Sequence, residues 1–499
     1  MVLPSSFTGE LVRSLGGPEW LRARRLAAFA RAREAEVPTG SEEIWRYSRV
    51  ADLHLERFTL AVPSQPDLSG LASGDVSVLG DLFSPVAATG EASSSPVPDR
   101  VAAFLGGVGS RSALVVTYGG RVVALEAASH PGLDAGGLEV VELSASTRRP
   151  EWTESTEALL GSVAGSFLAR WGTAGGADPV PALDLFDHLS DALASDAVVV
   201  RVRPGAVVEE PVVVVHLFGP GGVLGPGGAL GAELPVEERP GPAYSCRTVL
   251  DVGENAEASV MELLVSDDGP MLVLPTVETR VADGARLRHS VVQQLGRATW
   301  QIGHVFASAE RDATLRLFEA SLGGEYARSR IDSVLTGQGG SAQLLAAYLG
   351  DGDQMHDFRT LQEHDAPRST SDLVFKGAVG DRSRSVYSGL IRMRKGAKAA
   401  NAFQTNRNLV LSDGAHAESV PNLDIEENDV RCSHASAVGP VDEEQRFYLE
   451  SRGVPRRAAE RLIVLGFFRE LLERVPEPVA RHVVAAVEER VRDMTETMT

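Results

Sequence analysis

Apolar and polar positions divide the chain into helical ends and a long β-rich middle. From about residue 197, short apolar runs alternate with Gly, Asp and Asn, as in AVVVRVRPGAVVEEPVVVVHLF. This pattern is typical of strands joined by tight turns. The stretch ALVVTYGGRVVAL predicts a hairpin with Gly119 and Gly120 at its turn. Apolar residues at helical spacing return near the C-terminus, as in RRAAERLIVLGFFRELLERV.

The β-rich middle contains a repeat. Four turn-like stretches place Ala256, Ala285, Ala313 and Ala342 at intervals of 29, 28 and 29 residues, each before a β run. A constant period of this length indicates stacked supersecondary units. Because the units contain short strands and almost no helix, we predict a β-solenoid, in which each coil buries its inner face against the next. A meander or sandwich with evenly spaced hairpins is the alternative that the period leaves open.

The same patterns predict how the chain is divided into regions. We expect an N-terminal helical region at 1–60, a flexible linker at 61–100, an α+β region at 101–196, a solenoid core at 197–435 with a Gly/Pro-rich insert at 219–243, and a C-terminal helical domain at 436–499.

Charge and composition limit the choice of partners. The formal net charge of −20 repels nucleic-acid phosphates and anionic lipids, so we expect neither nucleic acid nor membrane as a direct partner. The first residues, MVLPSSFTGELVRSL, lack the apolar core of a signal peptide. The longest apolar run, PVVVVHLF, is far shorter than the roughly 20 residues that span a bilayer. Two cysteines make no disulfide framework, so we expect a cytoplasmic protein.

One of those cysteines lies beside a histidine. In a strand, Cys432 and His434 would point to the same side, roughly 6–7 Å apart. Thiolate and imidazole suit zinc or iron–sulfur clusters, but a site normally needs four ligands. Since Cys246 lies far away in sequence, the residues alone leave two interpretations. Either this is a buried thiol beside an ordinary histidine, or it is half of a site that a second polypeptide completes.

A second polar cluster lies in DGDQMHDFRTLQEHDAPRSTSD. It offers a carboxylate-and-histidine metal site or a general acid/base pair, built from His356, Asp357, Glu363, His364 and Asp365. Hydrogen-bonded turn residues are the simpler interpretation. The chain has no GxxxxGK[ST] loop, so we do not expect it to hydrolyse ATP itself.

Consecutive motifs in residues 376–453 resemble the SufB/SufD family, the scaffold subunits of the SUF iron–sulfur cluster assembly machinery. The stretches NRNLVLSD, PNLDI, DVRCSHASAVG and DEEQRFYLESRG match that family in order and spacing. Weaker likeness continues upstream through EHDAPRSTSDLVFKG and EEIWRYS, leaving out 61–100 and 219–243. The chain is more similar to the SufD branch. Its SDGAHAESVP lacks the cysteine that SufB-type chains carry there, and it has the Cys-x-His of SufD-type chains.

The resemblance implies a fold and a role. It implies a right-handed parallel β-helix core, flanked by helical N- and C-terminal regions, in a non-catalytic scaffold subunit. That subunit would pair with a SufB-type paralogue, and a nascent iron–sulfur cluster would form at their interface. His434 is implied as a contributor to the cluster, and Cys432 matches the family's cysteine at that place. The SufC-type ATPase is expected to dock on the C-terminal helices, at Phe447, Tyr448, Leu449, Arg452 and Gly453.

Several expectations stay open at this stage. We expect no cofactor bound tightly by this chain alone, and whether a reduced flavin joins the complex is undecided. An exposed solenoid seam makes a homodimer an option when the SufB-type partner is missing. The competing functions are a SufB-type scaffold and, from another class, a β-helix enzyme that acts on polysaccharide through the cluster at 351–365.

Overall fold

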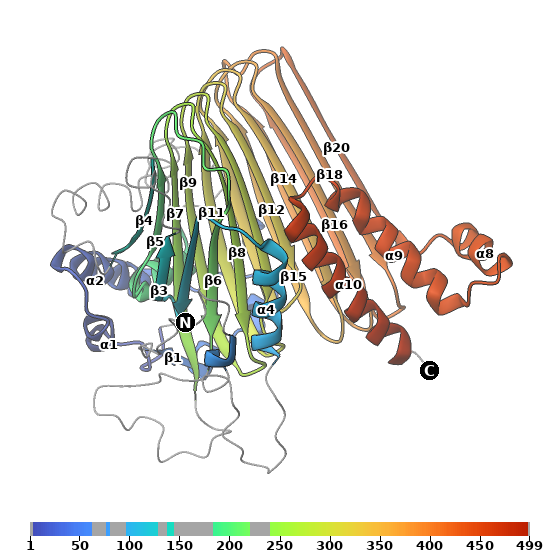
Figure 1. Ribbon diagram of the computed structural model, residues 1–499, viewed down its shortest axis with the longest axis horizontal. Coiled ribbons are helices and arrows are strands. Elements are labelled where there is room, and N and C mark those ends of the chain that lie inside the picture. The colour runs from blue at the N-terminus through green and yellow to red at the C-terminus, as the bar shows by residue number, and fades with distance from the viewer. Residues whose placement is uncertain are drawn as a thin grey trace, which may run out of the picture.

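The structure is a computed structural model that describes residues 3–61, 76–79, 96–127, 137–143, 183–219 and 240–497. Helices lie in its N-terminal and C-terminal parts (Figure 1). The α-helices are α1 (Gly9–Ser14), α2 (Glu19–Glu34), α4 (Val97–Val108), α7 (Leu185–Leu193), α8 (Glu443–Ser451), α9 (Arg456–Leu472) and α10 (Glu477–Thr497). The short 3-10 helices are η1 (Glu43–Trp45), η2 (Val50–Asp52), η3 (Leu55–Arg57) and η5 (Val76–Leu79).

Two ten-stranded sheets form the body of the molecule. The first, sheet A, contains β1 (Phe58–Leu60), β4 (Leu138–Glu142), β5 (Val198–Val202), β7 (Gly241–Val252), β9 (Met271–Val281), β11 (Thr299–Ala309), β13 (Tyr326–Leu335), β15 (Met355–His364), β17 (Arg384–Met393) and β19 (His416–Ile425). The second, sheet B, contains β2 (Ala113–Tyr118), β3 (Arg121–Ala127), β6 (Val212–Phe218), β8 (Glu257–Ser266), β10 (Arg286–Gln294), β12 (Thr314–Ser321), β14 (Ser341–Gly350), β16 (Thr370–Val379), β18 (Ala400–Val410) and β20 (Val430–Pro440).

The chain alternates between these sheets, so each coil adds one strand to sheet A and one to sheet B. From β5 to β20, every strand pairs in parallel with the strand two places earlier or later along the chain. Figure 1 shows the coils stacked side by side, from the green strands to the orange ones. The predicted β-solenoid is confirmed, and the meander and the sandwich are excluded.

The alanine repeat marks one corner of the coil, with one correction. Ala256, Ala285 and Ala313 each stand just before a strand of sheet B and are buried. The residue that continues their row is Gly340, because its neighbour Ser341 pairs with the residue after Ala313. Ala342 lies two positions further on. The coil is shorter here than the repeat suggested, because the turns differ in length.

Helices cover the outer face of each sheet. Sheet B packs its apolar outer face against α4, α9 and α10, which lie in front of the strands in Figure 1. Sheet A is covered by the N-terminal elements, with Trp45 and Phe186 buried against it. None of the described helices is long and apolar enough to cross a lipid bilayer.

The elements cross the expected boundaries of the regions. The hairpin at Gly119 and Gly120 is confirmed as β2–β3, but β2 also pairs with β6, so part of 101–196 belongs to the solenoid. The expected linker contains η5 and the first residues of α4, and the expected insert ends inside β7. Strand β20 continues to Pro440, beyond the core's expected end. The rest of the linker and insert lie outside the described residues. The same holds for EALLGSVAGSFLARW, a stretch whose sequence predicts a helix.

The last coil, made of β19 and β20, leaves one end of the solenoid open. Each of these strands is the final one of its sheet. Residues that face inward in earlier coils are buried, whereas the inward-facing Leu423, Ile425 and Val438 are 38%, 46% and 45% exposed. We call this last coil the open end.

Candidate functional site at the open end of the solenoid

Strand β20 carries Cys432 and His434 on its inner side. In the parallel pairing with β18, Cys432 lies beside Ala402, and His434 lies beside Gln404. Ala402 belongs to a small buried cluster, and the Cys432 side chain packs against that cluster. Since side chains two apart share a side, both potential ligands face the mouth of the open end.

The two side chains differ in burial. The thiol of Cys432 is half-buried, and burial raises its pKa, so it rests as the neutral thiol. The ring of His434 is exposed and makes no hydrogen bond within the part of the chain that the structure describes. A metal that binds here must displace the thiol proton, because thiolate is the ligating form.

Two donors do not complete a site. Among the described residues, no three His, Cys, Asp or Glu side chains come close enough to hold a metal ion. A tetrahedral centre would need further ligands. The arrangement at the open end is therefore an incomplete donor set, and it lies where another molecule can reach it.

Beneath His434, the structure reveals a residue that the sequence did not single out. The side chain of Gln404 is 1% exposed, yet neither its amide nitrogen nor its amide oxygen has a hydrogen-bond partner in the described chain. A buried polar group without a partner costs about 1–3 kcal/mol. Such groups are rare in folded proteins, and each calls for an explanation.

The polar cluster at 351–365 does not form a site, because the strand divides it between two faces. In β15, His356 faces inward, where its Nδ1 lies 2.9 Å from the Ser321 hydroxyl and its Nε2 lies 3.1 Å from the Leu349 carbonyl. Asp357 has the opposite orientation and accepts hydrogen bonds from the guanidinium of Arg328 at 2.8 Å.

The remaining members of that cluster are also engaged. His364 lies eight residues after His356 on the same strand, shares its inner face, and hydrogen-bonds to Ser369 and Ser371 at 2.8 Å. Burial lowers the pKa of His356 to about 3 and that of His364 to about 4. Glu363 pairs with two arginines on the outer face, and Asp365 is exposed. The residues are hydrogen-bonded, as the simpler interpretation held, but four of the five lie in strand β15 and not in a turn. The cluster offers no support for a polysaccharide-acting enzyme.

A second inward-facing group, also missed by the sequence, lies in the first coils of the solenoid. The carboxylate of Glu262 accepts hydrogen bonds from His216 at 2.9 Å and from His289 at 2.6 Å, with Thr248 donating a third at 2.9 Å. Burial raises the pKa of Glu262, but the two histidine hydrogen bonds outweigh it and hold that pKa below the usual range. Cys246 lies beside this group, and burial, with the nearby Glu262 charge, raises its pKa well above the ordinary value.

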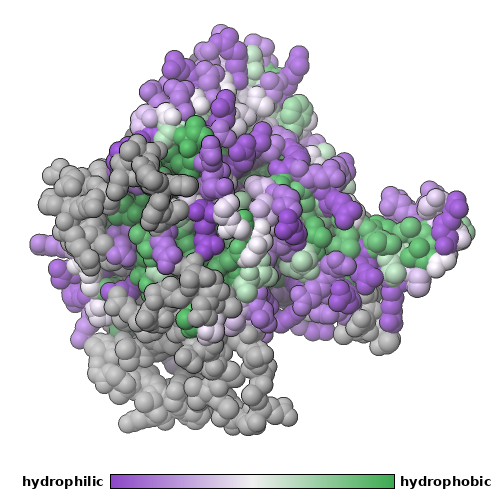
Figure 2. Space-filling view, viewed as in Figure 1, coloured by the Kyte–Doolittle hydropathy of each residue, from purple (hydrophilic) through white to green (hydrophobic). Residues whose placement is uncertain are grey.

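Helix α8 forms an arm that extends from the body of the molecule. It has no buried residue, and it packs against α9. Phe447 is 71% exposed and Tyr448 58% exposed, while Gly453, at a φ of 85°, ends the helix as the sequence predicted. In Figure 2, hydrophobic side chains gather on the projecting arm at the right, where Figure 1 shows α9 leading to α8. The residues expected to dock an ATPase lie on this arm: Phe447, Tyr448, Leu449, Arg452 and Gly453.

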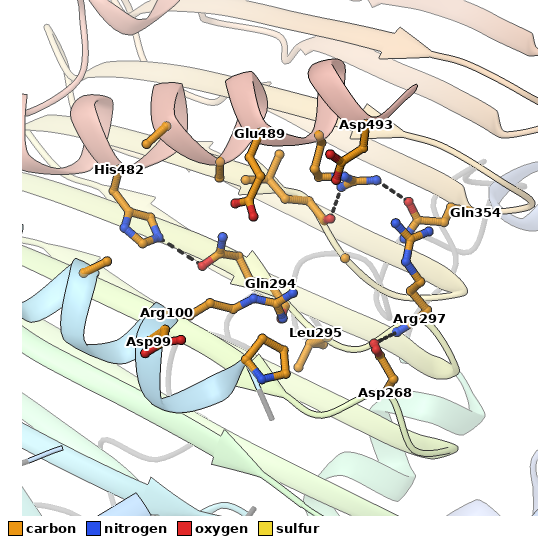
Figure 3. Close-up of a pocket in the computed structure, with 17 residues that line it drawn as sticks. Asp99, Arg100, Asp268, Gln294, Leu295, Arg297, Gln354, His482, Glu489 and Asp493 are labelled. Atoms are coloured by element: carbon orange, nitrogen blue, oxygen red, sulfur yellow. Dashed lines mark hydrogen bonds between the residues drawn. The ribbon is translucent and has the colours of Figure 1, made fainter. Parts of the chain in front are cut away.

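A pocket of about 440 Å³ lies away from the open end, between α4, α10 and the turns of sheet B (Figure 3). Its charged side chains are largely committed to one another. Arg297 and Arg490 both bind the carboxylate of Asp351. The His482 ring contacts the Gln294 amide at 3.0 Å, and burial, helped by the charge of Arg100, lowers its pKa to about 4. None of the lining residues is a cysteine. We interpret this pocket as a structural gap where α10 packs against the solenoid, and not as a ligand site.

Together these features define a class of protein: a β-solenoid with an incomplete donor set at its open end and an exposed helical arm. Comparison with known proteins then gives the family. Residues 236–467 match the family described as SUF system FeS cluster assembly, SufBD core domain. This part of the chain is similar to the SufB/SufD family, and the relatives named SufD make the chain most like SufD.

Three relatives illustrate the likeness. An iron-sulfur cluster assembly SufBD family protein of Mycobacterium tuberculosis is 39% identical over 229 residues, covering 44% of this chain and 58% of the relative. SufD of Escherichia coli is 29% identical over 310 residues, 62% of this chain and 70% of that protein. SufD of Bacillus subtilis is 30% identical over 217 residues, 43% of this chain and 50% of that protein. The chain thus matches little more than half the length of its mycobacterial relatives.

Proposed function

We propose that this chain is a SufD-type scaffold subunit that helps to assemble iron–sulfur clusters, in a complex with a SufB-type paralogue and a SufC-type ATPase. The observation that carries the proposal is the pair Cys432 and His434, which face inward on the last strand of an open solenoid. Two donors at an exposed edge form half of a site. The likeness to the SufBD core domain supports an iron–sulfur cluster as the cargo of such a site.

The edge strands themselves provide a means of joining the partner. The outer edge of β20 has no neighbouring strand in the described chain, so its backbone N–H and C=O groups can pair with a strand from another chain. Such pairing would bring the partner's ligands to the mouth of the open end. It would also cover Leu423, Ile425 and Val438, and the burial of their apolar surface favours association.

The chemistry asked of this chain is ligation. Iron arrives as substrate, and the imidazole of His434 offers it a nitrogen ligand. Cys432 must release its proton to bind, and its raised pKa makes that release depend on the metal. The chain contributes no phosphate-binding loop, so ATP hydrolysis belongs to the SufC-type partner.

The exposed arm would receive that ATPase. Helix α9 leads from the arm to the body, where the ammonium of Lys376 on β16 binds Glu470 at 2.6 Å. Arg474, just beyond α9, binds Asp372 on the same strand. Closure of two ATPase subunits would pull on α8 and α9, and β16 would transmit the displacement through β18 to β20. This motion would open or close the seam between the two scaffolds.

The site is tested with His434→Ala in the co-expressed three-subunit complex, by measuring bound iron and acid-labile sulfide. We expect the cluster to be lost while the complex stays assembled. The matched control is His416→Ala, an exposed histidine of the same last coil that faces outward and binds Glu418. A full cluster yield from His434→Ala would defeat the proposed site.

The docking surface is tested by affinity capture of the SufC-type subunit. Phe447→Ala together with Tyr448→Ala removes two exposed aromatic rings, and we expect capture to fall by at least about tenfold, because aromatic anchors dominate interface energies. Val207→Ala, which removes an exposed apolar side chain elsewhere, is the control. Unchanged capture by the double variant would place the docking surface elsewhere.

Four expectations from the sequence stay predictions within this proposal. They are the cytoplasmic location, the absence of a tightly bound cofactor in the isolated chain, the open question of whether a reduced flavin joins the complex, and the option of a homodimer when the SufB-type partner is missing. The homodimer uses the same edge of β20, so the size of the isolated chain in solution is the measurement that decides it.

A further inference from the structure

The unpartnered amide of Gln404 contrasts with its neighbours on the inner face of β18. Asn406 donates to the Tyr348 hydroxyl at 2.9 Å, and Asn408 donates to the Asn406 carbonyl oxygen at 2.8 Å. The Gln404 amide, in the same row of inward-facing residues, has no partner at either atom in the described chain. Buried amides elsewhere on this strand thus form hydrogen bonds, whereas that of Gln404 forms none with the described residues.

The opposite strand leaves room for that amide. Gly389 lies on β17, and a Cβ at this position would come within 2.5 Å of the Gln404 Nε2. The same added atom would also collide with the hydroxyl of Tyr387. The absence of a side chain at Gly389 therefore allows the amide to reach across the interior.

A second unpartnered group lies one coil higher. The hydroxyl of Ser419 on β19 is also buried without a partner, and Ser419 pairs in register with Tyr387. His434 stands directly beside Gln404 in the neighbouring strand. Unused hydrogen-bonding groups from both sheets thus lie in the last two coils, and Gln404 is the one that lies beside the donor pair.

We propose that Gln404 contacts the iron–sulfur cargo, with its Nε2–H donating a hydrogen bond to a sulfide held at Cys432 and His434. This inference deepens the proposed function and rests on it. Hydrogen bonds to cluster sulfurs stabilise the cluster and set its reduction potential. Among the described residues the amide has no hydrogen-bond partner, and the bound cargo would supply one.

The test is Gln404→Leu in the co-expressed complex. Replacing an unpartnered amide with an apolar group of similar size leaves the fold as stable or more stable, so the melting temperature of the isolated chain should hold or rise. The complex should lose its cluster roughly 10-fold faster, the order of loss found when a supporting hydrogen bond near a metal is removed. The reduction potential of the remaining cluster should fall.

A matched control uses the same substitution deeper in the solenoid. Gln362→Leu on β15 changes another inward-facing glutamine, which donates to the Ser371 hydroxyl, and it should leave the lifetime and potential of the cluster unchanged. A purely structural role for Gln404 predicts the reverse of our expectation, with a lower melting temperature and an unchanged potential.

A second variant keeps the inference testable if the branched leucine disturbs folding. Gln404→Met keeps an unbranched shape without hydrogen-bonding groups, and it should give the same loss. A cluster of normal lifetime and potential in a folded variant overturns the role of Gln404. If His434→Ala abolishes the cluster in the same preparation, the proposed function survives that result. A full cluster in His434→Ala removes the proposed site itself.

Discussion

The two ends of the solenoid carry the same kinds of residue on the same inner face. The first coils hold Cys246 with His216, Glu262 and His289, and the last coil holds Cys432 and His434. In the first coils, which we call the closed end, these side chains are at most 4% exposed and the histidines bind a carboxylate. At the open end the thiol is half-buried and the imidazole exposed.

The difference shows that composition does not make a ligand site. At the closed end, the capacity of Glu262 to accept hydrogen bonds is used by three donors of the same chain. At the open end, the capacity of the donors is unused, and the edge of the sheet gives another molecule access. Four predictions test this contrast, from the largest expected effect to the smallest.

The two thiols should differ most in reactivity. In the folded chain, iodoacetamide should label Cys432 at least about 1,000-fold faster than Cys246, because full burial shifts a thiol pKa by several units and blocks access. Labelling of Cys432 should rise with pH, since burial also raises its pKa. Mass spectrometry of timed samples measures both labelling rates. Comparable rates would show that the two ends do not differ in the accessibility of their thiols.

The carboxylate at the closed end should matter greatly for stability. Glu262→Ala leaves two buried histidines without their partner, and we expect a loss of about 3–5 kcal/mol in the free energy of unfolding. His434→Ala should stay within about 0.5 kcal/mol of the parent, as exposed positions do. Urea unfolding of the isolated chains compares them, and equal losses would show that both ends serve the fold.

Equal truncations of leucine should have unequal effects. Leu287→Ala, in a buried inward-facing position, should lower the free energy of unfolding by about 2–4 kcal/mol. Leu423→Ala at the open end should lower it by less than about 1 kcal/mol. The cost at Leu423 should grow when the same pair is measured in the assembled complex. A cost at Leu423 that does not change on assembly would argue against burial of the open end by a partner.

The smallest effect concerns pH. Because the pKa of His364 is lowered to about 4 from the usual 6.5, the folded chain binds fewer protons than the unfolded chain between these values. Stability contributed by this group is complete above pH 6.5 and is lost as the pH falls toward 4. We expect His364→Gln to reduce the loss between pH 7 and 5 by about 2 kcal/mol, measured by urea unfolding at each pH. Parallel curves for parent and variant would contradict the buried neutral imidazole.

Much of the fold followed from local rules in the sequence. Tight corners accept only small residues, so alanines recur once per coil and reveal the solenoid. Gly340 takes the position of the repeated alanine in the coil whose turn is shorter. The corner requires a small residue but not alanine in particular. The strand's alternation also placed Cys432 and His434 on one side correctly.

The rest depended on contacts that no short stretch encodes. His216, Glu262 and His289 come from three strands, and only the stacking of coils brings them together. Gln404 lies in an ordinary strand sequence, and its amide stands out only once every neighbour is placed. The last coil is open because no further strand of the described chain pairs with it. A pattern of residues within the coil cannot predict that absence.

The contact between α4 and α10 has a consequence for how the molecule is made. These helices are far apart in the sequence, at Val97–Val108 and Glu477–Thr497, and they pack together on sheet B (Figure 1). Coils can form in the order of synthesis, but the apolar strip that receives α10 stays bare until that helix emerges from the ribosome. A chain cut before α10 should therefore bind a hydrophobic dye that the full chain ignores. Helix α10 would then let the cell's quality control distinguish the copies that contain this helix from those that lack it.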